Sequence, residues 1–278
     1  MTSWKQTHAA AWIVGQCLAV ASVVVGARAV SGPVGETLRW RRLPGGTGSW
    51  VAPWALWTMG AYLVVSATCA LAWRDAGRAD AYSKLSVVIL AHPWSMWVAT
   101  GLLAPLGEEL LFRGVGLTLL GEGGRRTVAV IATALMFAAV HVEAYKLLPI
   151  ALLGFVFARV AWATRSIIPS LIAHVGVNTV AVVASVRLDR AGWKPAASSV
   201  GMGPTVLLGI LSCILAFHAW RATRALEAAC AIADRRRDEA ESAKVVSIVD
   251  ALAGTAACLP GGLDAGAGAS RGADPRED

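Results

Sequence analysis

The segment Ala104-Pro105-Leu106-Gly107-Glu108-Glu109-Leu110-Leu111-Phe112-Arg113-Gly114 places three charged side chains inside an otherwise apolar run. Near the centre of a bilayer each charge costs roughly 2.5–3.5 kcal/mol on the insertion scale. Glu109 and Arg113 are four positions apart, so on a helix they share a face and can form an ion pair. Glu108 lies about 100° away around the helix and has no partner on it. A carboxylate in that position suits general acid or base chemistry.

The rest of the chain surrounds this segment with apolar sequence. Hydrophobic residues make up 56% of its 278 residues and charged residues only 15%, and the mean hydropathy is +0.58. A soluble domain carries roughly 25% charged residues, and disorder needs low hydrophobicity. Five cysteines are too few for a disulfide scaffold. The net charge of +7 fits basic residues flanking membrane spans, and no nucleic-acid-binding motif accompanies it.

We therefore expect an all-α, polytopic transmembrane helical bundle of about eight spans, with seven as the alternative. The expected spans are 9–27, 50–73, 85–107, 108–120, 127–142, 147–158 with its extension, 166–186 and 196–220. The first is also compatible with a signal peptide, but the many later spans favour a retained anchor. Tryptophans at span edges are expected to form an interfacial belt, namely Trp50, Trp54, Trp73, Trp162 and Trp220.

The number of spans depends on whether 108–120 crosses the membrane separately from 85–107. With eight spans, both termini are cytoplasmic, and five arginines fall on the side of Arg74, opposite the loop that contains Arg39. These five are Arg125, Arg126, Arg165, Arg221 and Arg224. We expect a membrane-embedded domain over 1–220, followed by a cytoplasmic tail over 221–278 that is first helical and then disordered.

Two later apolar segments supply further polar side chains. One ends in Phe137-Ala138-Ala139-Val140-His141, and the other contains His174-Val175-Gly176-Val177-Asn178. Three helices thus offer a glutamate, a histidine, and a histidine with an asparagine on one face. Such a set can activate water and stabilise a peptide oxyanion. The alternatives are a structural ion-pair network for the charges, an interfacial position for His141, and helix packing for Asn178.

These three motifs, Glu-Glu-x-x-x-Arg, Phe-x-x-x-His and His-x-x-x-Asn in this order, resemble the signature of the CPBP family of intramembrane proteases. This family is related to the eukaryotic CAAX prenyl endopeptidase, and its bacterial members are also called Abi proteins. The resemblance covers about residues 102–181. It implies about eight helices around a polar cavity that opens toward the cytoplasm.

The resemblance also implies roles for individual residues. Glu108 and His141 would activate water, His174 and Asn178 would stabilise the oxyanion, and Glu109 and Arg113 would organise the site. The family has been described both as zinc metalloproteases and as glutamate peptidases. Glu108, His141 and His174 are an adequate zinc set, but the absence of His-Glu-x-x-His from the sequence favours a metal-free mechanism.

The expected function is intramembrane cleavage of a peptide or protein near a membrane-anchored C-terminus, in a bacterial plasma membrane. The expected partners are that substrate and the lipid bilayer, with no nucleic acid. The alternative is a non-catalytic scaffold or immunity protein of the same family that binds peptides. A transporter with a midplane carboxylate is disfavoured, because the sequence has no internal repeats.

Overall fold

The expected all-α fold is confirmed for the residues that the computed structural model describes, which are 2–29, 34–43, 46–72, 89–141, 144–190 and 202–257. Two of the helical elements, η1 (Trp97–Leu103) and η2 (Glu109–Gly116), are π-helical, and η3 (Glu122–Gly124) is a 3-10 turn. The elements are α1 (Thr2–Ala29), α2 (Val34–Thr37), α3 (Gly48–Ala72), α5 (Pro93–Met96), η1 (Trp97–Leu103), α6 (Ala104–Glu108), η2 (Glu109–Gly116), α7 (Leu117–Leu120), η3 (Glu122–Gly124), α8 (Arg126–Ala139), α9 (Ala144–Thr164), α10 (Ile168–Arg190) and α11 (Met202–Ala257).

Four of the described helices contain stretches long and apolar enough to cross a membrane, in α3, α9, α10 and α11. Shorter apolar stretches lie in α1 and α8. Many large apolar side chains on these helices are exposed, among them Leu56, Leu135, Leu148 and Leu207. A soluble protein would not expose so many apolar side chains, whereas acyl chains can cover them. The chain is therefore a multi-pass helical membrane protein.

The expected spans 85–107 and 108–120 are not two separate helices. The elements from α5 to α7 follow one another without a break, so residues 93–120 form one helical run. Pro105 lies inside this run, where η1 and η2 adapt the turns on either side of α6. The expectation of a separate short helix was wrong, because π-helical turns accommodate the proline and the charges pair within the protein.

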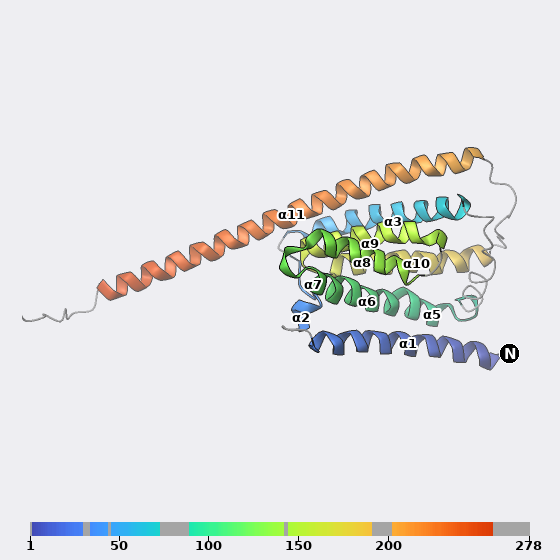
Figure 1. Cartoon of the computed structure of the whole chain (residues 1–278), viewed down its shortest axis with the longest axis horizontal. Coiled ribbons are helices and arrows are strands. Elements are labelled where there is room, and N and C mark those ends of the chain that lie inside the picture. The colour runs from blue at the N-terminus through green and yellow to red at the C-terminus, as the bar shows by residue number, and fades with distance from the viewer. Residues whose placement is uncertain are drawn as a thin grey trace, which may run out of the picture. The chain divides into compact units, whose positions relative to one another are not determined.

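Among the described residues, the helix connections that contain arginines lie at one end of the bundle, so the loop of Arg39 is not opposite Arg165 as expected. The Arg39 side chain donates to the carbonyl of Ala161, and the Arg39 carbonyl accepts a bond from the Ile167 N–H. The turns between α1 and α3, α7 and α8, and α9 and α10 share this end (Figure 1). We call it the arginine end. Arg74 lies outside the described residues.

Trp54 belongs to the core rather than to the expected interfacial belt. It is fully buried against Phe157 and Leu226, and its indole N–H donates to Thr223 at 3.1 Å. Trp54 lies on the inner face of α3, and its N–H finds a partner on α11, as a buried indole requires. Trp50 and Trp220 are exposed and Trp162 is partly buried, whereas Trp73 lies outside the described residues.

The chain divides into two compact units, Met1–Asp234 and Arg235–Asp278. In the first unit, α11 continues beyond Trp220, and Leu226 and Cys230 are buried in the core. In the second unit, residues 235–252 are helical and all of them are exposed. The disorder expected at the end of the tail falls mainly on 258–278, outside the described residues.

Candidate active site

The buried core of the site is the ion pair between Glu109 and Arg113. Their side chains are fully buried, and Arg113 Nη1 lies 3.1 Å from Glu109 Oε1, as the spacing of four residues predicts. Arg113 also donates to the carbonyl of Gly154 on α9 at 3.3 Å. Its guanidinium carbon lies 4.2 Å from the centroid of the Phe137 ring, a cation–π contact. The pair therefore ties the 93–120 run to α8 and α9.

His174 on α10 connects this ion pair to Glu108. Its Nδ1 lies 3.0 Å from Glu109 Oε1, and its Nε2 lies 3.6 Å from Glu108 Oε2. Since Glu109 pairs with Arg113, it is an anionic acceptor, and Nδ1 must carry the proton in this bond. The ring is thereby held with Nε2 facing Glu108.

Glu108 is the accessible carboxylate of the two. Its side chain is 29% exposed, whereas that of Glu109 is fully buried. Its Oε2 atom is buried but makes no hydrogen bond with any residue in the described part of the chain. The distance of 3.6 Å to His174 is too long for a direct hydrogen bond, but the two atoms can share a water molecule. The pair is thus suited to hold a small reactant.

His141 lies at the end of α8, where its Nδ1 is 2.8 Å from the carbonyl of Phe137. Because a carbonyl only accepts, this bond places the proton on Nδ1 and leaves Nε2 as an acceptor. The Phe137 ring contacts both histidines, with centroid distances of 5.0 Å to His141 and 5.6 Å to His174. The Phe137 ring therefore lies between His141 and His174 and contacts both.

Asn178 makes a hydrogen bond between helices, which fits the helix-packing role considered for it from the sequence. Its side-chain amide donates to the carbonyl of Thr100 at 2.7 Å. In η1 the N–H of Ala104 bonds to Ala99, five residues back. The next donor in that pattern would be Pro105, which has no N–H. Asn178 thus satisfies a carbonyl that the proline leaves without a helical donor, and it links α10 to η1.

The zinc set considered from the sequence is not assembled. In the part of the chain that the structure describes, no three His, Cys, Asp or Glu side chains are placed to hold a metal ion. His174 is bonded to Glu109, and His141 is bonded at its own helix end. Both of these bonds use Nδ1, so the Nε2 atom of each histidine points away from its bonded partner.

Sequence reasoning missed the groups that fix the polar side chains in place. These are the backbone carbonyls of Thr100 and Gly154, together with the aromatic ring of Phe157 beside His174. Only the first had a usable signal, since a proline inside an apolar run implies an unsatisfied carbonyl one turn earlier.

Comparison with known proteins identifies a family over the motif region. Residues 84–180 match the family described as Type II CAAX prenyl endopeptidase Rce1-like. This matched range contains all three motifs. No curated protein and no solved structure matches the chain. The chain therefore carries, over residues 84–180, a domain of the Rce1-like type II CAAX prenyl endopeptidase family, as its three motifs indicated.

Proposed function

We propose that this protein is an intramembrane endopeptidase that cleaves a peptide or protein substrate near a membrane-anchored C-terminus. The observation that carries the proposal is the position of His174, with Glu109 at one ring nitrogen and Glu108 at the other. A carboxylate whose oxygen has no hydrogen-bond partner among the described residues, beside a fixed imidazole, is the arrangement that activated-water hydrolysis needs. Membership of the Rce1-like family supports the same reaction class.

Charge balance supports the protonation states. If Glu108 acts as a base it is anionic, and with Glu109 and Arg113 the cluster then carries one net negative charge. In a buried environment of low dielectric constant, an uncompensated charge is costly, so a net charge of zero on the cluster is favoured. A doubly protonated His174 restores it, donating from Nδ1 to Glu109 and presenting an Nε2–H beside Glu108. That N–H is positioned to stabilise an oxyanion.

The proposed reaction begins with water held at Glu108, with His141 Nε2 as a second acceptor. Glu108 takes one proton as the water oxygen attacks the peptide carbonyl carbon. The carbonyl oxygen becomes an oxyanion, stabilised by His174 and by the second amide N–H of Asn178. As the intermediate collapses, Glu108 returns its proton to the peptide nitrogen, the C–N bond breaks, and a carboxyl group and an amine leave.

Peptide binding without cleavage is the alternative function. It is favoured by the bond between Asn178 and Thr100, since this bond explains the asparagine without catalysis. The two functions are distinguished by comparing the membrane and secreted proteins of cells with and without this chain. We expect new protein C-termini in its presence that disappear with Glu108→Gln but persist with Glu122→Gln, an exposed control. Identical C-termini in all strains would contradict a protease.

We also propose seven crossings, with the arginine end in the cytoplasm. A single helical run over 93–120 supports the odd number, and the cytoplasmic excess of basic residues supports the orientation. The N-terminus then lies outside, contrary to the expectation that both termini are cytoplasmic. In a cysteine-free background, Arg42→Cys and Glu122→Cys should react with a membrane-impermeant reagent only from the cytoplasmic side. Arg187→Cys should react from the other side; labelling of Arg42→Cys and Glu122→Cys from opposite sides would contradict this topology.

A further inference from the structure

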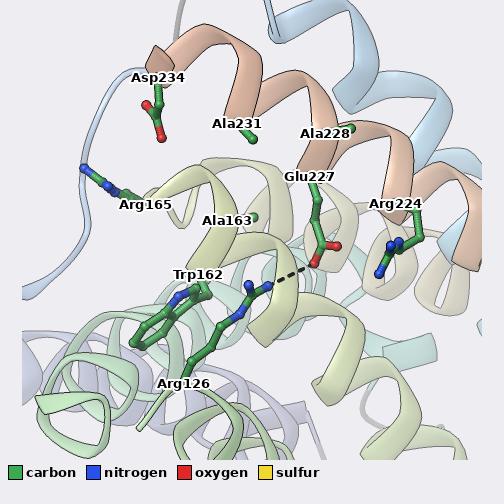
Figure 2. A pocket seen from close by; sticks show the side chains of 9 residues that line it. All are labelled: Arg126, Trp162, Ala163, Arg165, Arg224, Glu227, Ala228, Ala231 and Asp234. Carbon is green, nitrogen blue, oxygen red and sulfur yellow. Dashed lines mark hydrogen bonds and ion pairs between the residues drawn. The ribbon is translucent and has the colours of Figure 1, made fainter. Parts of the chain in front are cut away.

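A polar pocket of about 430 Å³ lies at the arginine end, between the start of α8, the end of α9 and α11. Its volume falls within the range of roughly 300–1,000 Å³ typical of ligand sites. Neither Glu108 nor His174 lines it, so it is separate from the candidate active site. Figure 2 shows the side chains that face it, which include Arg126, Trp162, Arg165, Arg224, Glu227 and Asp234.

The pocket carries a surplus of positive charge. Glu227 is already neutralised, because Arg159 bonds to both of its carboxylate oxygens, at 3.0 and 2.5 Å, and Arg126 lies 3.3 Å away. Arg165 and Arg224 are exposed and form no ion pair with any residue that the structure describes. Asp234 is the remaining acidic group that lines the pocket. Two arginines are therefore available for an anionic ligand.

The positive charge near the pocket also acts on Arg39, which lies in the neighbouring loop. Its guanidinium carbon lies 4.8 Å from the centroid of the Trp162 ring. Burial, together with the nearby charges of Arg165 and Arg41, lowers the pKa of Arg39 to about 10. The charge of Arg165 thus repels that of Arg39, whereas Arg41 is paired with Glu36 at 3.1 Å. A bound anion would relieve this repulsion.

The backbone holds this region in a defined shape. Arg39 and Arg165 are the two described non-glycine residues with positive φ, at 52° and 51°. Residues in this conformation persist where the surrounding structure enforces them, and they concentrate at ligand sites. Trp162 packs closely on Gly121, where a Cβ atom would lie 2.4 Å from the indole ring. The position of Trp162 at the side of the pocket is therefore fixed by its packing on Gly121.

An exposed apolar stripe on α11 begins one helical turn from Arg224, which lines the pocket. Along α11 the residues Trp220, Phe217 and Ile210 are exposed, and their spacing places them on the helix face that carries Arg224. Arg159 on α9 stacks over Trp220 with a distance of 4.4 Å from its guanidinium carbon to the ring. The stripe runs from the arginine end toward the middle of the span. A free phosphate would use only the arginines, whereas a phospholipid would use both surfaces.

We propose that this pocket binds the phosphate headgroup of an anionic phospholipid. Arg165 and Arg224 bind the phosphate, Trp162 lies against the glycerol region, and an acyl chain covers the stripe on α11. Basic pockets between transmembrane helices on the cytoplasmic side suit such headgroups. The bound lipid tethers α8, α9 and α11 to one another at the arginine end.

The test is a lipid titration of the purified full-length protein in detergent, followed by native mass spectrometry. The probes are phosphatidylglycerol, phosphatidylcholine and inorganic phosphate. We expect phosphatidylglycerol to bind selectively, and Arg165→Gln/Arg224→Gln to weaken it on the order of 20-fold, since each arginine contributes about fivefold. The control Arg187→Gln/Arg190→Gln removes the same charge from exposed positions at the other end of α10 and should bind as the parent does.

Equal binding of phosphatidylcholine, or equal loss in the control variant, would overturn the proposal. So would displacement of the lipid by inorganic phosphate at the same concentration, which would indicate a free-phosphate site. The melting temperature without lipid serves as the folding check, and it should not change because both arginines are exposed and unpaired among the described residues. If the double variant melts early, Arg224→Gln alone must weaken binding about fivefold.

Discussion

Glu109 holds the candidate active site together, because both Arg113 and His174 depend on its one buried carboxylate. Glu109→Gln would leave the buried guanidinium of Arg113 without its ion-pair partner. Breaking a buried pair in this way typically costs about 3–5 kcal/mol. We expect a lower melting temperature in detergent and less protein in the membrane. Glu122→Gln, at an exposed position, should melt as the parent does.

A compensated variant separates stability from activity at the same position. Glu109→Gln/Arg113→Met removes both charges, which is often nearly neutral for stability. This double variant should recover most of the melting temperature but no peptidase activity, because His174 has lost its anionic partner. Recovery of full activity would show that the cluster is only structural.

Asn178 has two proposed roles, bonding to the Thr100 carbonyl and stabilising the oxyanion, and a substitution of Pro105 can separate them. Asn178→Ala leaves the Thr100 carbonyl unsatisfied, costing about 1–3 kcal/mol of stability. If the amide also stabilises the oxyanion, kcat should fall roughly 100- to 1000-fold with KM nearly unchanged.

In Pro105→Ala/Asn178→Ala, the new N–H at position 105 can bond to the Thr100 carbonyl. We expect this double variant to recover stability while kcat stays low, as measured by thermal unfolding and steady-state kinetics. A double variant with the kcat of Pro105→Ala alone would leave Asn178 as a packing residue.

The 93–120 run is held against its neighbours by close backbone contacts. At Gly114 a Cβ atom would lie 3.0 Å from the backbone of Leu38, which cannot move aside as a side chain can. Gly114→Ala should therefore lower stability by about 1–3 kcal/mol. At Gly209 on α11 a Cβ atom would meet nothing within 4 Å. Gly209→Ala should be neutral or stabilising by up to about 1 kcal/mol in thermal unfolding, and equal losses in both variants would contradict this packing.

The elements were predictable to the extent that their signals are local. Apolar runs identified α3, α9 and α10, and the four-residue spacing identified the pair of Glu109 and Arg113. The continuous run over 93–120 was not predictable, because proline and charge normally end a span. It depends on π-helical turns and on a bond from Asn178, 78 residues away along the chain.

The site was predictable as a set of residue types but not as a geometry. Spacing placed His174 and Asn178 on one face, yet the structure directs them to different partners, Glu109 and the Thr100 carbonyl. The order of the three motifs indicated the family. The contacts among them could not be predicted, because residues far apart in sequence meet only through tertiary packing. Trp54 was misread because a tryptophan near a span edge can face either the lipid or the core.

At the scale of the whole molecule, the two compact units indicate where the chain tolerates truncation. A chain ending at Asp234 keeps the first unit, and we expect kcat and melting temperature close to those of the parent. A chain ending at Arg224 loses the buried Leu226 and Cys230 and the partner of Arg159, Glu227. Losing one buried leucine side chain alone costs about 2–5 kcal/mol. The shorter chain should melt early; equal melting of both truncations would contradict the packing of α11.

The most direct test of the account is peptide cleavage by purified Glu108→Gln protein. Glutamine keeps the shape of Glu108 but cannot take a proton from water. A substrate found through its new C-terminus would be incubated with the parent, Glu108→Gln and Glu122→Gln proteins, and products would be followed by mass spectrometry. We expect no cleavage by Glu108→Gln at an unchanged melting temperature, and full activity in Glu122→Gln. Cleavage by folded Glu108→Gln at the parent rate would contradict this expectation.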